Sequence, residues 1–126
     1  MSLSRGARFV AVIFAGSGVL HLARPQVFQG AVPDVLPAHR ELVYLSGIAE
    51  LLCAIGLAVP TTRRPAAIAT AALLVAIFPA NVQMAWDAGE DLVSNGATTQ
   101  RGVYLAATLV RLPLQIPLIR WAWRAR

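Results

Sequence analysis

The chain has 126 residues, which is room for one domain. Hydrophobic residues make up 57% of the chain and charged residues 13%, whereas soluble domains average about 45–50% and about 25%. This composition excludes an ordinary soluble protein. The net charge of +5 does not indicate nucleic-acid binding, because the basic residues are all arginines that flank apolar runs and form no patch with interleaved aromatic residues.

The first apolar run predicts a helix over about residues 7–23. Arg5 and Arg8 precede it, as in a signal peptide, but "GVLHLARP" is a poor cleavage site, so we expect the helix to be retained. The next segment, "RPQVFQGAVPDVLPAHRE", carries Pro25, Pro33 and Pro37 among apolar residues. It is too apolar for a free linker, and we expect it to fold back on the helix ends or to lie at the membrane interface.

Three further apolar runs predict helices over about residues 42–59, 66–86 and 103–123. Crossing a bilayer takes about 20 helical residues, so each run is long enough. Pro60 and Pro65 bracket the break between the first two of these helices, and the polar stretch "DAGEDLVSNGATTQ" is not expected to continue a spanning helix. We therefore predict an all-α fold, an integral membrane four-helix bundle that forms one domain over residues 1–126.

The arginines in the loops predict the orientation of the bundle. With a cytoplasmic N-terminus, six of them lie inside and three outside. Both termini are therefore expected in the cytoplasm, in a multi-pass protein of a bacterial-type cytoplasmic membrane. The six are Arg5, Arg8, Arg63, Arg64, Arg124 and Arg126, and the three are Arg24, Arg40 and Arg101.

Arg111 lies inside the fourth apolar run and needs a partner, because an intramembrane charge is costly unless it pairs or reaches water. Glu50 follows Glu41 by nine residues and so lies about 13 Å below the outer end of the second helix. Arg111 lies nine residues after Gly102, at a similar depth in the fourth helix. We predict that Glu50 and Arg111 form a buried ion pair.

Other polar side chains are predicted at similar depth, and Pro79, Pro113 and Pro117 are expected to kink the helices that carry some of them. The pattern predicts a polar pocket that opens toward the outside. An open alternative is that these side chains only hold the helices together. The candidate ligand-binding residues are His21, Glu50, Asn81, Arg111 and Gln115, with Ser17, Ser46, Gln83 and Thr108 nearby.

Small residues and the single cysteine have simpler predicted roles. Cys53 is expected to pack in the core, and one thiol excludes an internal disulfide. Two histidines and one cysteine, widely spaced, make no recognisable metal motif, so no metal site is expected. We expect Gly16, Gly18, Gly47 and Gly56 to permit close helix contacts.

Several segments resemble the DoxX-like family of small four-helix membrane proteins. They are "GSGVLHLARPQVF", "VPDVLP", "SGIAELL", "FPAN" and "RLPLQ", and the resemblance covers nearly the whole chain. It implies membrane biology associated with redox chemistry, in a subunit of an oxidoreductase complex. It also places a set of residues on the family's motif positions: His21, Pro25, Pro33, Pro37, Ser46, Gly47, Glu50, Pro79, Asn81, Arg111, Pro113 and Gln115.

Three functions stay open at this point. The first is a membrane redox subunit that binds a quinone headgroup through His21 or Arg111, with the electron source on a redox protein partner, because the chain has no intrinsic cofactor motif. The second is a binding or transport protein for a small amphipathic molecule or lipid, expected as a homo-oligomer in the bilayer. The third is a membrane chaperone or scaffold subunit without a ligand. No nucleophile–base–acid arrangement indicates an enzyme that acts alone.

Overall fold

The computed structural model describes residues 2–32 and 34–126, and Pro33 lies outside the described residues. Four of the helices are long and apolar enough to cross a bilayer, which confirms the predicted spanning helices and indicates a multi-pass membrane protein. Every regular element in these two ranges is helical. The elements are α1 (Arg5–Ala23), the short α2 (Gln26–Gln29), α3 (His39–Ala58), α4 (Arg63–Asn95) and α5 (Thr99–Arg124).

Helix α4 is longer than predicted. The polar stretch after residue 86 was expected to end the helix, but α4 continues to Asn95. Side-chain bonds one turn apart support this extension: Gln83 Nε2 donates to Asp87 Oδ1 at 2.8 Å, and Asn95 Nδ2 donates to Asp91 Oδ1 at 2.7 Å. The helix ends where Gly96 adopts a positive φ of 90°. The polar residues after residue 86 end the apolar part of α4, but the helix itself continues through them.

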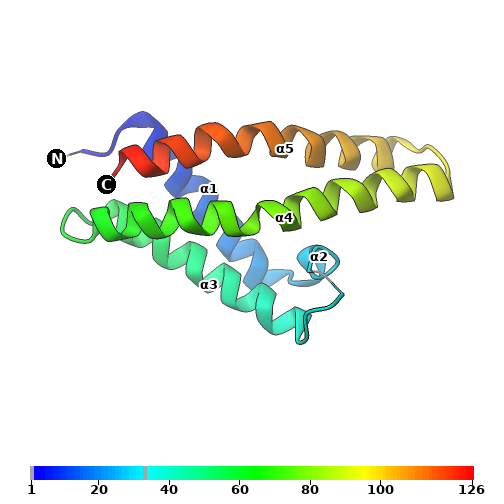
Figure 1. Ribbon diagram of the computed structural model, residues 1–126, viewed down its shortest axis with the longest axis horizontal. Coiled ribbons are helices and arrows are strands. Elements are labelled where there is room, and N and C mark those ends of the chain that lie inside the picture. Colours follow the sequence, from blue (N-terminus) through cyan, green and yellow to red (C-terminus); the bar gives the residue numbers. More distant parts are fainter. Residues whose placement is uncertain (1, 33) are drawn as a thin grey trace.

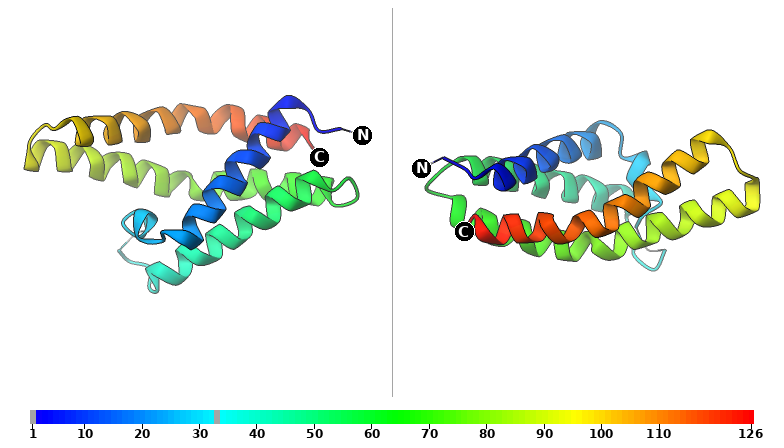
Figure 2. Two further views of the ribbon diagram at one scale, coloured as in Figure 1. Left: turned by 180° about the vertical axis from the view of Figure 1, so that it is seen from behind. Right: turned by 90° about the horizontal axis from the view of Figure 1, so that it is seen from above.

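The helices form two pairs, α1 with α3 and α4 with α5 (Figure 1). Both chain termini and the α3–α4 connection lie at one end, where the pairs converge. Toward the other end the pairs separate, and the α4–α5 hairpin extends beyond α1 and α3, as both views in Figure 2 show. The bundle is therefore splayed at the end opposite the termini.

The packed core lies at the converging end, because the start of α1 and the end of α3 meet there with the start of α4 and the end of α5. Phe14, Leu57 and Leu74 are among its largest fully buried side chains. Cys53 belongs to this cluster, as predicted. Apolar packing concentrated at one end leaves the other end of the bundle open for polar groups.

Glycines bring α1 and α3 into close backbone contact. A Cβ atom on Gly18 would lie 2.8 Å from the carbonyl oxygen of Gly47, and one on Gly47 would lie 2.6 Å from His21 Cβ. A Cβ on Gly56 would similarly meet Ala66 at 2.6 Å. The prediction was wrong for Gly16, because nothing lies within 4 Å of the place its Cβ would occupy.

The segment between α1 and α3 folds back on the end of α1, one of the two arrangements expected from its apolar residues. Its short helix α2 buries Phe28, and Ala31 behind it is also buried. The segment lies at the diverging end of the bundle (Figure 1). It therefore partly covers the opening between the two helix pairs.

Candidate functional site

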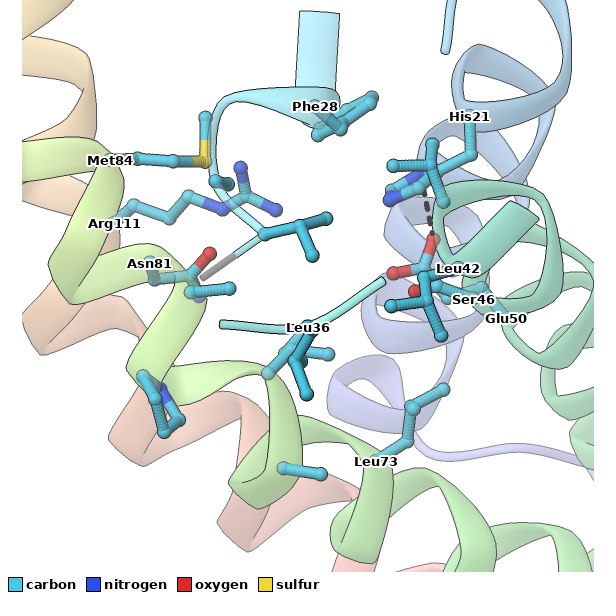
Figure 3. A pocket seen from close by; sticks show the side chains of 17 residues that line it. His21, Phe28, Leu36, Leu42, Ser46, Glu50, Leu73, Asn81, Met84 and Arg111 are labelled. Carbon is cyan, nitrogen blue, oxygen red and sulfur yellow. Dashed lines mark ion pairs between the residues drawn. The ribbon is translucent and has the colours of Figure 1, made fainter. Parts of the chain in front are cut away.

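Two cavities lie between the helix pairs. The first has a volume of about 450 Å³, and its lining includes His21, Ser46, Glu50, Asn81 and Arg111 among apolar side chains (Figure 3). The second, of about 430 Å³, is lined mainly by apolar residues of α1 and α5. Volumes of this size are within the range of small-molecule sites. Four residues line both cavities: Phe28, Glu50, Ile77 and Arg111.

His21 and Glu50 form one wall of the first cavity. His21 lies in the last turn of α1 and Glu50 in the middle of α3, and both are buried, with 7% and 1% of their surface exposed. His21 Nδ1 lies 3.5 Å from Glu50 Oε2. The absent side chain of Gly47 makes this approach possible, because a Cβ there would occupy the space of His21 Cβ.

The hydrogen bonds of His21 set which of its nitrogens carries the proton. Nδ1 donates to the backbone carbonyl of Ser17 at 2.6 Å. A carbonyl oxygen only accepts hydrogen bonds, so Nδ1 carries a proton. Phe28 stacks on this ring with centroids 3.8 Å apart and 6° between the planes. The stacked phenyl ring fixes the plane in which the imidazole faces the cavity.

Glu50 has an unsatisfied buried atom. Its Oε2 accepts no hydrogen bond from any residue that the structure describes. An unsatisfied buried polar group costs about 1–3 kcal/mol, and more when it is charged. This oxygen faces His21 Nδ1 at 3.5 Å and has almost no accessible surface of its own.

Arg111 lies on the wall opposite His21 and Glu50 (Figure 3). The predicted ion pair between Glu50 and Arg111 was wrong: within residues 2–32 and 34–126 Arg111 makes no ion pair or hydrogen bond, and the nearby base of Glu50 is His21. The physical reason is the pairing of the helices. Glu50 belongs to the α1–α3 pair and Arg111 to the α4–α5 pair, and the cavity separates them.

Asn81 and Gln115 connect α4 to α5 behind Arg111. Asn81 Nδ2 donates to Gln115 Oε1 at 3.2 Å, and Gln115 Nε2 donates to the backbone carbonyl of Leu74. This carbonyl lies one residue before that of Val75, which is the carbonyl that loses its helical N–H donor at Pro79. The amide pair therefore links α5 to α4 close to Pro79, and holding helices together is the role that the structural alternative gives these residues.

The structure brings four of the five candidate residues to the first cavity and places Gln115 on the second. Thr108 and Gln83 do not join them. Thr108 donates to the carbonyl of Leu105, and Gln83 donates to Asp87 in its own helix. Phe28 was missed as a site residue, because it lies in a connecting segment without a periodic apolar pattern. The apolar character of that segment was the only signal that indicated its burial.

The two walls differ in their hydrogen-bonding groups. The α1–α3 wall carries the Glu50 carboxyl group, the His21 imidazole and the Ser46 hydroxyl. The opposite wall presents the guanidinium of Arg111, which only donates. Within the described ranges, no group of three or more His, Cys, Asp or Glu residues is arranged to hold a metal ion. The arrangement places polar side chains on opposite walls of a mainly apolar cavity.

Comparison with known proteins identifies the family of the chain. No curated protein and no solved structure matches the sequence. Residues 10–126 match a family described as a domain of unknown function, DUF8561, and this match includes every candidate site residue. Because the match covers nearly the whole chain, the protein belongs to the DUF8561 family.

Proposed function

We propose that the protein binds a quinone-type headgroup in the first cavity, as the membrane subunit of a redox complex. The observation that carries the proposal is the placement of Arg111 without an ion pair or hydrogen bond from any described residue, facing Glu50 and His21 across a cavity of about 450 Å³. An arginine at the centre of a membrane helix costs about 2.5–3.5 kcal/mol on insertion scales. A bound oxygen acceptor would offset part of this cost.

The shape of the site favours a quinone over a headgroup with one polar end. A quinone carries two oxygens on opposite edges of an apolar ring, and the cavity carries polar side chains on opposite walls with apolar side chains between them. Phe28, Leu36 and Leu73 provide apolar surface for the ring (Figure 3). Arg111 then donates to one oxygen, and the His21–Glu50 wall contacts the other.

The remaining parts of the proposal follow from the sequence. The arginine distribution favours both termini in the cytoplasm of a bacterial-type cell, so the cavity lies in the outer half of its cytoplasmic membrane. The resemblance to DoxX-like proteins supports a redox setting. The chain has no cofactor motif of its own, so the proposal assigns the electron source to a partner protein.

Substitution of Arg111 tests the proposal. Arg111→Leu removes the donor, and we expect it to abolish binding of a short-chain benzoquinone to the protein in nanodiscs, measured by calorimetric titration. Arg120→Leu is the matched control, because Arg120 lies on the same helix but is exposed and lines neither cavity. Equal quinone affinity in wild-type protein and Arg111→Leu would contradict the proposal.

A second candidate function is the binding or transport of a small amphipathic lipid. The second cavity favours it, because apolar side chains such as Ile13, Leu20 and Leu118 line a space that continues from Glu50 and Arg111. A hydrocarbon chain would fit there while a polar head contacts Arg111. Thermal stabilisation by a non-redox lipid, with no effect of quinones, would support this function over the first.

A further inference from the structure

We infer that the converging end of the bundle binds the phosphate headgroup of an anionic phospholipid, and that Arg5 and Arg124 form the site. The inference concerns a second site and does not depend on what the cavities bind, because neither arginine lines them. It follows from the charge of this end, from arginines that have no partner within the protein, and from an aromatic contact that places two of them near each other.

The charge of the converging end is the first step. Both termini and the α3–α4 connection lie there (Figure 1), and they carry six of the eleven basic residues. The six are Arg5, Arg8, Arg63, Arg64, Arg124 and Arg126. The six acidic residues, all of which the structure describes, lie elsewhere: Glu50 in the middle of α3 and the other five toward the diverging end. Like charges without an acidic neighbour repel one another, and a bound anion relieves this repulsion.

Several of these arginines keep their hydrogen-bond donors available. Arg5, Arg64 and Arg124 are exposed, and their side chains make no hydrogen bond or ion pair with any residue that the structure describes. At the diverging end, in contrast, Arg101 Nε lies 3.2 Å from Asp91 Oδ2. The converging end therefore presents guanidinium groups that the protein itself does not neutralise.

An aromatic contact places Arg5 near Arg124. Phe9 of α1 packs edge to face on Trp121 of α5, with ring centroids 5.8 Å apart. The helices approach closely here, because a Cβ on Gly6 would overlap the indole of Trp121. Arg5 lies one turn before Phe9 on the same face of α1. Arg124 lies about one turn after Trp121 on the same face of α5. Because α1 begins and α5 ends at this end, both arginines lie on the outer side of the aromatic contact.

A phospholipid headgroup matches this arrangement. Guanidinium groups bind phosphate oxygens through paired hydrogen bonds, and two of them can share one phosphodiester. Aromatic rings such as those of Phe9, Trp121 and the exposed Trp123 lie beside the arginines, and indoles favour the depth where headgroups meet acyl chains. A soluble acidic protein would contact the arginines but not the rings below them. The quaternary ammonium of phosphatidylcholine would be repelled by the surrounding arginines, so the end favours an anionic lipid.

Quenching of tryptophan fluorescence by brominated lipids measures which lipid contacts this end. Trp86→Phe removes an exposed indole on α4 and leaves Trp121 and Trp123, which both lie at the converging end. The protein is reconstituted in phosphatidylcholine with rising fractions of brominated phosphatidylglycerol or brominated phosphatidylcholine. Both leaflets have the same composition, so the orientation of the protein does not affect the result.

We expect phosphatidylglycerol to bind at least about fivefold more tightly than phosphatidylcholine at low ionic strength, and the preference to shrink in high salt. Equal binding of the two lipids would overturn the inference. It would leave the proposed function intact, because quinone titration measures the cavities and not this end.

Substitution of the two arginines assigns the preference to them. Arg5→Gln combined with Arg124→Gln removes two charges and their paired donors, and we expect the preference to fall below about twofold. Arg24→Gln combined with Arg40→Gln is the matched control, because it removes two exposed arginines at the diverging end, and it should keep the wild-type preference. An unchanged preference in the first variant would overturn the assignment of the site. The comparison of the two lipids without these variants decides the lipid preference itself.

Discussion

At the scale of single residues, the site depends on side chains that are absent as well as on those that are present. Gly47 has no Cβ, and this allows His21 to lie against α3, 3.5 Å from Glu50. Arg111, in contrast, belongs to the α4–α5 pair and lies across the cavity from Glu50. Close packing of α1 against α3 therefore positions the His21–Glu50 wall, and the separation of the two helix pairs places Arg111 on the opposite wall.

Gly47→Ala tests the packing that positions His21. The added methyl group would lie 2.6 Å from His21 Cβ and 3.1 Å from the Gly18 carbonyl, and neither atom is the end of a flexible side chain. We expect a loss of about 1–3 kcal/mol in stability, as for other overpacked positions, measured by reversible unfolding in detergent.

Gly16→Ala is the control for this substitution. Gly16 lies on α1 with nothing within 4 Å of its Cβ position, so the methyl group meets open space. Alanine favours a helix over glycine by about 0.8–1 kcal/mol in a helix interior, and the variant should be as stable as the wild type or more so. A similar loss of stability in both variants would contradict the close-packing account.

At the scale of elements, the amide pair Asn81–Gln115 links α4 to α5 close to Pro79. Gln115→Leu removes the donor to Leu74 and the acceptor of Asn81. The buried amide of Asn81 then lacks this partner, and we expect thermal unfolding followed by circular dichroism to show a loss of about 1–3 kcal/mol.

Gln83→Leu serves as the comparison for this element. Gln83 bonds only Asp87 within α4, and such pairs contribute about 0.2–0.5 kcal/mol. The loss of stability in Gln83→Leu should therefore be several times smaller than that in Gln115→Leu. Equal losses would show that the link between α4 and α5 contributes nothing beyond an ordinary surface pair.

The spanning helices were predictable because each is a continuous apolar run of sufficient length. The end of α4 was not, because polarity shows where a helix leaves the apolar region, whereas the positive φ of Gly96 ends the helix. Four-residue α2 is too short to produce a periodic pattern. Its position over His21 depends on tertiary packing.

The candidate residues were selected by their depth and helix face, and four of them line one cavity. The partner of Glu50 was predicted wrongly for a physical reason. Counting residues from the helix ends predicts the same depth for Glu50 and Arg111. Depth alone does not determine how far apart two residues lie in the plane of the membrane. Lateral separation depends on which helices pair, and the close contact of α1 with α3 through Gly18 and Gly47 brings His21 to Glu50 instead.

At the scale of the whole molecule, the two helix pairs pack tightly at the end that contains the termini and separate at the other end (Figure 1). The apolar core therefore stabilises the fold without filling the site. The buried residues of the core cluster do not line the first cavity. A substitution that fills this cavity should therefore affect binding more than stability.

Ala80→Trp tests this separation. Ala80 lines the first cavity on α4, and an indole there would occupy much of the space between the pairs. We expect quinone affinity to fall at least tenfold in calorimetric titration while the protein stays folded. Val75→Trp is the control, because Val75 is 59% exposed on the same helix and lines neither cavity. Equal affinities in the two variants would contradict the assignment of the cavity as the site.

The central claim is that the cavity between the helix pairs binds a quinone-type headgroup through Arg111. Native mass spectrometry of the protein released gently from its own membrane tests this claim most directly, because it identifies any molecule that remains bound. We predict a co-released quinone or quinol that is present in Arg120→Leu and absent in Arg111→Leu. A wild-type protein that carries no small molecule, or a molecule that Arg111→Leu retains, would contradict the claim.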